Sequence, residues 1–126
     1  MYKILAVDDE PRIAEVLHEF LTKAGFDVKN VLGGREAIEI IKSDIKIDLM
    51  VLDMKMPKVT GFDVIKEMER INKKLPTIIL TGSIDAEKYL GGLRALGYTR
   101  EDILHKPVDL FELLDAVKKK LQQQFQ

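Results

Sequence analysis

Cysteine is absent from this sequence of 126 residues. The absence excludes disulfide bonds, metal sites built from thiolates and cysteine nucleophiles. Any metal-binding or catalytic chemistry must therefore use other side chains. A chain without cysteine is also consistent with a reducing cytoplasm, which is the location that we expect.

The sequence also lacks a marked excess of either charge. Its 20 Lys and Arg residues and 21 Asp and Glu residues give a formal net charge of −1. No overall electric field is expected to hold such a chain on nucleic acid or on an anionic membrane. We therefore expect no direct nucleic-acid binding by this domain.

Long apolar runs are missing as well. The apolar run at residues 4–7 is too short for a signal peptide, and Asp8 and Asp9 end it. No stretch approaches the roughly 18 to 20 apolar residues that a membrane span needs, so we expect no membrane association. The length is that of one domain. We assign residues 1–121 to this domain and residues 122–126 to a tail or to the start of a linker.

Short apolar runs alternate with segments of helical periodicity. The expected strands are residues 4–7, 26–31, 49–52, 77–80 and 103–104. The expected helices are residues 11–24, 34–41, 62–71, 85–96 and 110–121. Three of the strands are continuous apolar runs that end at a polar residue, as strands buried on both faces do. Alternation of this kind predicts an α/β fold with a doubly wound parallel sheet of five strands and helices on both faces.

Polar side chains follow four of these strands. Asp8 and Asp9 come after the first strand, Asp53 after the third, Thr81 after the fourth and Lys106 after the fifth. Each alone has an ordinary explanation as a helix cap, a turn residue or a solvated lysine. Because the carboxyl ends of parallel strands meet at one edge of a sheet, we expect these side chains to converge on one site.

The chemistry of this set favours phosphoryl transfer. Carboxylates gathered without a counter-ion repel one another, and a hard divalent cation removes that penalty. Oxygen ligands in an open site favour Mg²⁺. Asp53 can then act as a carboxylate nucleophile towards phosphorus, while Lys106 and Thr81 supply a positive charge and a hydroxyl donor for phosphoryl oxygens.

The sequence resembles the receiver domain of two-component response regulators over essentially its whole length. The motifs that carry the resemblance are Val7-Asp8-Asp9-Glu10, Asp53-Met54-Lys55-Met56-Pro57 with Gly61, Thr81-Gly82, and Lys106-Pro107. Each motif is weak by itself, but all four in this order are a strong signal. The resemblance implies the flavodoxin-like strand order 2-1-3-4-5.

The resemblance also implies roles for individual residues. Asp53 would accept a phosphoryl group from a histidine kinase or a histidine phosphotransfer protein. Asp8, Asp9, Asp53 and the backbone carbonyl of Lys55 would hold Mg²⁺, with Asp9 binding it directly and Asp8 through water. Thr81 and Lys106 would contact the phosphoryl oxygens. Glu10 is expected to be a helix cap rather than a ligand.

A receiver of this kind is not an enzyme in the ordinary sense, although it assists its own phosphorylation and dephosphorylation. Its further partners would be an output domain or a downstream protein. The fourth helix, fifth strand and fifth helix could also form a homodimer surface.

The chain departs from the family pattern at the usual switch position. The family commonly has Tyr or Phe three residues before the lysine of the fifth strand, and here that position is Ile103. A β-branched aliphatic side chain has few rotamers and no ring to withdraw. His105 shares a strand face with Ile103, and it is either part of a replacement switch or an ordinary surface histidine.

A second departure lies around the fourth helix. Gly91 and Gly92 each cost about 1 kcal/mol relative to alanine in a helix interior, and the link at residues 97–102 is longer than usual. These features predict an irregular fourth helix and a mobile loop before the fifth strand. We hypothesise that phosphorylation reorganises this region more than it rotates one side chain.

Two positions are expected to tune the phosphoryl lifetime. Lys55 and Ser83 lie two residues after Asp53 and Thr81, at sites that flank the approach of water in the family. Lys55 could also pair with the acidic cluster in the absence of metal, or it could be an ordinary solvated lysine.

Three other functions compete with the signalling switch. A Mg²⁺-dependent phosphatase with an aspartyl-phosphate intermediate would carry its Asp-x-Asp pattern after the first strand, where this chain has Asp8-Asp9-Glu10. A flavodoxin-like nucleotide or flavin binder would need a phosphate loop, which the chain lacks. A receiver used only for docking or dimerisation is disfavoured by the complete set of acidic, threonine and lysine residues.

Overall fold

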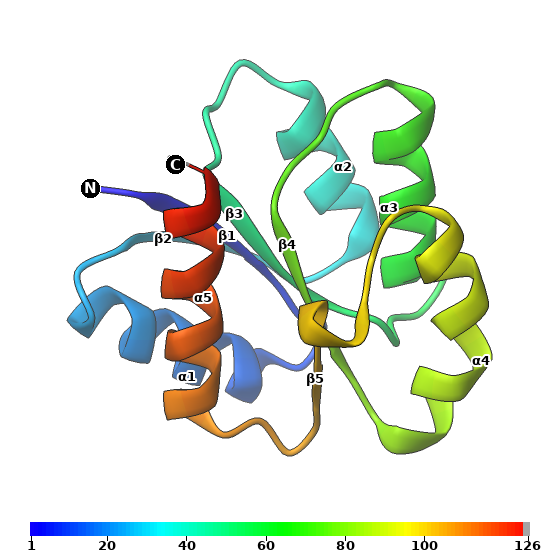
Figure 1. The fold of residues 1–126 in the computed structure, drawn as a ribbon. Coiled ribbons are helices and arrows are strands. Elements are labelled where there is room, and N and C mark those ends of the chain that lie inside the picture. The colour runs from blue at the N-terminus through cyan, green and yellow to red at the C-terminus, as the bar shows by residue number, and fades with distance from the viewer. Residues whose placement is uncertain (125–126) are drawn as a thin grey trace.

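The computed structural model describes the backbone of residues 1–124, and the side chains of this range except those of residues 83–86 and 124. The strands are β1 (Lys3–Val7), β2 (Asp27–Val31), β3 (Leu49–Asp53), β4 (Thr77–Thr81) and β5 (Ile103–His105). They form one parallel sheet in the order β2-β1-β3-β4-β5 (Figure 1). The predicted fold class and strand order are confirmed.

Helices cover both faces of the sheet. They are α1 (Pro11–Lys23), α2 (Gly34–Lys42), α3 (Gly61–Arg70), α4 (Ser83–Ala95) and α5 (Leu110–Gln124). Figure 1 shows α1 and α5 on one face, and α2, α3 and α4 on the other. Every helix in the described part of the chain is too short or too polar to span a lipid bilayer.

The alternation of side chains along β1 explains the two layers. Ile4 and Ala6 pack in one core cluster with residues of α1 and α5. Leu5 and Val7 pack in a second cluster with residues of α2 and α3. Because successive side chains of a strand point to opposite faces, a strand covered on both faces must be apolar throughout. β3 and β4 are accordingly buried at every position.

Helix starts follow the expected local signals with one exception. Pro11 occupies the first turn of α1, where its missing N–H has no intrahelical partner to lose. The carboxylate of Asp109 caps α5 by accepting hydrogen bonds from the backbone N–H groups of Phe111 and Glu112, at 2.9 and 3.2 Å. Glu10 occupies the N-cap position of α1, but its side chain makes no capping hydrogen bond. Glu10 thus stands at the expected cap position, without a hydrogen bond from its side chain to the helix.

The expectation of an irregular fourth helix is also wrong. α4 runs without a break from Ser83 to Ala95 and includes Gly91 and Gly92. Gly92 is explained by packing, because a Cβ atom placed on it would lie 2.6 Å from Cζ of Phe62. A side chain at position 92 would force this ring to move, and the contact offsets the low helix propensity of glycine.

The segment before β5 contains a short 3₁₀ helix, Arg100–Asp102. The Thr99 hydroxyl oxygen accepts a hydrogen bond from the Glu101 backbone, and the Thr99 backbone N–H donates to the Asp102 carboxylate. Asp102 also forms an ion pair with Lys120 of α5. These contacts connect the segment to α5, and its mobility stays a prediction.

The last helix continues to Gln124. It therefore extends into the segment 122–126 that we expected as a tail, of which residues 125 and 126 lie outside the described part. The boundary after residue 121 remains a prediction.

Candidate functional site

The candidate site lies at the carboxyl ends of the strands, towards the bottom of Figure 1. In the sheet register, Val7 is the partner of Leu52, and Asp53 is the partner of Leu80. Asp8 follows Val7 directly after β1, and Thr81 follows Leu80 as the last residue of β4. The parallel arrangement thus brings the polar ends of neighbouring strands together, as the sequence predicted.

Three carboxylates form an acidic cluster at this edge. Asp8, Asp9 and Asp53 each offer one carboxylate oxygen, and these three oxygens lie within 4.8 Å of one another. Asp8 and Asp53 are 0% and 2% exposed, whereas Asp9 is half-buried. Three hard oxygen donors around one point, with one of them facing solvent, suit a hydrated cation such as Mg²⁺. The residues present therefore fit the metal that the sequence predicted.

Among the described side chains, Lys106 is the cation that forms ion pairs with this cluster. Its Nζ lies 3.2 Å from Oδ2 of Asp8 and 3.2 Å from Oδ1 of Asp53. Its backbone N–H donates a 2.8 Å hydrogen bond to the carbonyl of Thr81. Lys106 is thus fixed to β4 through its backbone, and its side chain is directed between two carboxylates.

The local environment shifts the pKa values of both partners. Burial, followed by the charge of Asp8, raises the pKa of Asp53 from 3.8 to about 6, although Lys106 opposes this rise. Burial lowers the pKa of Lys106, but the charges of Asp53 and Asp8 outweigh it and leave that pKa above its usual value. The single lysine therefore does not fully offset the repulsion between the carboxylates, which favours the binding of a further cation.

Backbone amides orient the two buried carboxylates. The N–H of Glu10 donates to Oδ1 of Asp8 at 2.9 Å. The N–H of Lys55 donates to Oδ1 of Asp53 at 3.4 Å, which is long for a hydrogen bond. One oxygen of Asp8 is therefore held by the backbone, while its other oxygen faces Lys106.

Thr81 lies at the same edge and is 2% exposed. Its hydroxyl donates a 3.1 Å hydrogen bond to the carbonyl of Gly82. This partner belongs to the adjacent residue, so rotation of the side chain frees the hydroxyl for another acceptor. The geometry is compatible with the predicted contact to a phosphoryl oxygen, and that role remains a proposal.

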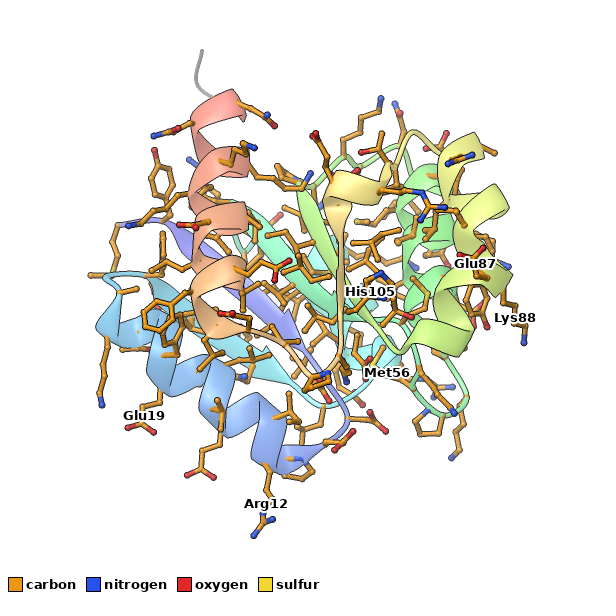
Figure 2. The ribbon with its side chains drawn as sticks, turned by 60° about the horizontal axis from the view of Figure 1, so that its bottom comes forward. Arg12, Glu19, Met56, Glu87, Lys88 and His105 are labelled. Carbon is orange, nitrogen blue, oxygen red and sulfur yellow. The ribbon has the colours of Figure 1, made fainter. Side chains whose placement is uncertain are left out.

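The remaining predicted positions lie around this group. Ile103 is buried in the second core cluster, and His105 is exposed. Both line a cavity of about 30 Å³ with Glu87, Leu90 and Arg100, and Figure 2 shows His105 on the α4 side of β5. Ile103 and His105 thus share a strand face, as predicted, and this face of β5 lies towards α4.

Lys55 and Ser83 are the two positions expected to tune the phosphoryl lifetime. The Lys55 side chain is exposed. It is Lys106, among the described side chains, that forms ion pairs with the acidic cluster. The side chain of Ser83 lies outside the described residues.

Gly61 has a structural role that the sequence did not reveal. Its N–H donates to the carbonyl of Met54 at 3.0 Å. A Cβ atom placed on Gly61 would lie 2.4 Å from the carbonyl oxygen of Asp53. The start of α3 is therefore in direct contact with the backbone of Asp53. The sequence marked Gly61 only as part of a motif, because a contact across a loop leaves no periodic pattern.

Comparisons with known proteins agree on one family. A model of the response regulator receiver domain family matches residues 4–118. Response regulator SaeR of Staphylococcus aureus is 35% identical over 114 residues, which cover 90% of this chain and 48% of SaeR. The chain thus spans about half the length of the curated relatives it matches.

Solved structures show the same similarity. The receiver domain of a Francisella response regulator has a TM-score of 0.87 and 28% identity, and the match covers 98% of this chain and 99% of that one. The response regulator TrrA of Thermotoga maritima, solved in complex with Mg²⁺ and BeF, has a TM-score of 0.80 and 32% identity. That match covers 95% of this chain and 99% of TrrA.

Proposed function

Because the chain belongs to the family of response regulator receiver domains, we propose that it is a phosphorylation-controlled signalling switch. Asp53 accepts a phosphoryl group from a histidine kinase or a histidine phosphotransfer protein in a Mg²⁺-dependent reaction. The observation that carries this proposal is the buried Asp53 carboxylate, which lies beside two further carboxylates and the Lys106 ammonium.

The transfer exchanges one bond to phosphorus for another. A carboxylate oxygen of Asp53 forms a bond to phosphorus while the bond from phosphorus to the donor histidine nitrogen breaks. The nitrogen keeps the electron pair and gains a proton from solvent. Asp53 supplies the nucleophile, and Lys106 and Thr81 stabilise the negative charge on the phosphoryl oxygens. The product is an acyl phosphate on Asp53.

The acidic cluster would hold the metal. Asp8, Asp9 and Asp53, with the backbone carbonyl of Lys55, are the proposed ligands. When bound, Mg²⁺ supplies positive charge to the carboxylates and to the phosphoryl oxygens. Burial holds Asp8 and Asp53 in place before the metal arrives, and half-buried Asp9 leaves the cluster open to solvent. The complex of TrrA with Mg²⁺ and BeF supports this proposal by similarity.

Partners and location are part of the same proposal. The curated relatives are about twice as long as this chain, so an output domain or a downstream protein is proposed as the recipient of the signal. A homodimer through α4, β5 and α5 and a cytoplasmic location are also proposed. The reorganisation of the α4 region is proposed as the output of phosphorylation.

The test is a phosphorylation assay with a small acyl-phosphate donor. We expect intact-mass spectrometry to show one phosphoryl adduct in the presence of Mg²⁺ and none with excess chelator. Peptide mapping should place the adduct on Asp53. Steady turnover of phosphomonoesters would instead support the phosphatase. Failure to form an adduct with the small donor and with a panel of histidine kinases would support a docking module.

We expect Asp9→Asn to weaken Mg²⁺ binding about tenfold or more, equivalent to about 1.4 kcal/mol. The half-buried Asp9 carboxylate is the proposed direct ligand, and an amide oxygen is a weaker partner for a hard cation. Isothermal titration calorimetry measures the affinity. Glu10→Gln is the matched control, since it removes the neighbouring exposed carboxylate and should change the affinity less than about threefold. Equal losses in the two variants would contradict ligation by Asp9.

A further inference from the structure

The first turn of α3 connects the backbone of Asp53 with the surface of α4. Gly61 lies directly against the Asp53 carbonyl, since a Cβ atom on Gly61 would lie 2.4 Å from that oxygen and 2.8 Å from Cα of Met54. The backbone N–H of Met54 in turn donates to the carbonyl of Leu80 at 2.8 Å. The start of α3 is therefore in contact with the backbone on both sides of the Asp53–Met54 peptide bond.

Phe62 is the next residue of this turn, and its ring lies against α4. A Cβ atom on Gly92 would lie 2.6 Å from Cζ of the ring and 3.0 Å from Cε1. The ring of Tyr89, one helical turn before Gly92, has its centroid 5.3 Å from that of Phe62. The Nζ of Lys66 lies 5.1 Å from the centroid of Phe62. The tip of Phe62 thus occupies a notch on α4 that exists because residue 92 has no side chain.

Phe62 is one of the contacts that hold α4 against the second core cluster, in which Leu93 of α4 is buried. Among the described side chains of α4, only Leu93 is buried, while Tyr89 and Leu90 are half-buried. Lys88 extends away from the protein in Figure 2, with its Nζ 5.4 Å from the ring of Tyr89. A helix with so little buried surface is repositioned at low energetic cost.

We propose that Phe62 is the positioning residue that couples the phosphorylation state of Asp53 to the position of α4. Phosphorylation shifts the backbone at Asp53, Gly61 carries the shift into α3, and the ring of Phe62 moves in the Gly92 notch. α4 follows because this ring packs directly against Gly92 and Tyr89. The inference rests on the proposed function, since it requires that Asp53 is the phosphorylated residue.

Two adjacent glycines provide a matched pair of variants. Gly92→Ala places a methyl group where the ring now lies and displaces Phe62. Gly91→Ala places the same group in open space, with nothing within 4 Å of it. Both substitutions bring the same gain in helix propensity. A difference between the two variants in their response to phosphorylation therefore reports the contact with the Phe62 ring. Phe62→Leu removes the ring without adding volume to α4.

The experiment is amide hydrogen exchange at residues 87–95, measured with and without Mg²⁺ and beryllofluoride as the phosphoryl mimic. In the wild type and in Gly91→Ala, we expect the mimic to change exchange rates about five- to tenfold. In Gly92→Ala and Phe62→Leu, the change should fall below about twofold. Because coupling is reciprocal, the affinity for the mimic should change in these two variants and stay constant in Gly91→Ala.

The outcomes separate the inference from the proposed function. If the mimic does not bind the wild type, the proposed function fails, and the inference fails with it. If the mimic binds and exchange at residues 87–95 does not change in the wild type, only the inference is overturned. The same holds if the change is equal in the wild type, Gly92→Ala and Phe62→Leu.

Discussion

Replacing Asp53 by Asn is expected to stabilise the unphosphorylated, metal-free protein at neutral pH while abolishing the phosphoryl adduct. The adduct is lost because an amide is not a nucleophile for this reaction. The stability gain arises because burial and the charge of Asp8 raise the pKa of Asp53 to about 6. The folded state therefore carries the ionised carboxylate at a cost, and asparagine carries no charge.

The sign of the pH dependence follows from this raised pKa. The contribution of Asp53 to stability is fully present below its unfolded-state pKa and is lost as the pH rises through about 6. The advantage of Asp53→Asn should therefore be largest above pH 7 and shrink towards pH 4. A pKa difference of one unit between the folded and unfolded states corresponds to about 1.36 kcal/mol, so we expect a gain of about 1–3 kcal/mol at neutral pH.

Chemical denaturation between pH 5 and pH 8 measures this difference. Asp115→Asn, which removes an exposed carboxylate from α5, controls for the loss of one negative charge. A difference between Asp53→Asn and the wild type that does not grow with pH would contradict the prediction.

Lys106→Met is expected to destabilise the metal-free protein by about 2–4 kcal/mol at neutral pH, because removing one partner of a buried ion pair leaves uncompensated charge. Lys106 contacts both Asp8 and Asp53 at 3.2 Å, and its side chain is 24% exposed. Its loss removes the attraction that opposes the rise in the pKa of Asp53. The destabilisation should therefore decrease as the pH falls and Asp53 becomes protonated.

A double-mutant cycle tests this account of Lys106. Lys106→Met should destabilise the Asp53→Asn protein less than it destabilises the wild type, because one of the two carboxylates that contact Lys106 is already neutral. Mg²⁺ should restore part of the stability of Lys106→Met, since it binds the folded state. Strictly additive effects with no influence of pH or Mg²⁺ would show that Lys106 acts through packing alone.

The location of the candidate site could be predicted because sequence and topology are linked directly in a parallel sheet. A continuous apolar run that ends at Asp53 or at Asp8 marks the carboxyl end of a buried strand. Once five strands, three of them continuous apolar runs, alternate with helices, their carboxyl ends must meet at one edge. Neither step requires knowledge of a contact between distant residues. The cluster of three carboxylates with Lys106 follows from the strands alone.

The structure departs from the expectations for the fourth helix and for the start of α1. In both places it is shaped by interactions that local sequence does not encode. The propensities of Gly91 and Gly92 predicted an irregular helix, but a ring from α3 packs against Gly92 in an unbroken α4. Likewise, Glu10 stands at the N-cap position of α1 without a capping bond from its side chain. Its backbone N–H instead binds Asp8, so the local geometry is set by the site rather than by the helix.

The notch at Gly92 also restricts how this chain can vary. Phe62 and Gly92 lie far apart in the sequence, but they divide one fixed volume between α3 and α4. A larger residue at position 92 is acceptable only with a smaller or displaced one at position 62. A side chain at position 92 would force the ring at position 62 to move, and covariation between the two positions would mark receivers that join these helices in the same way.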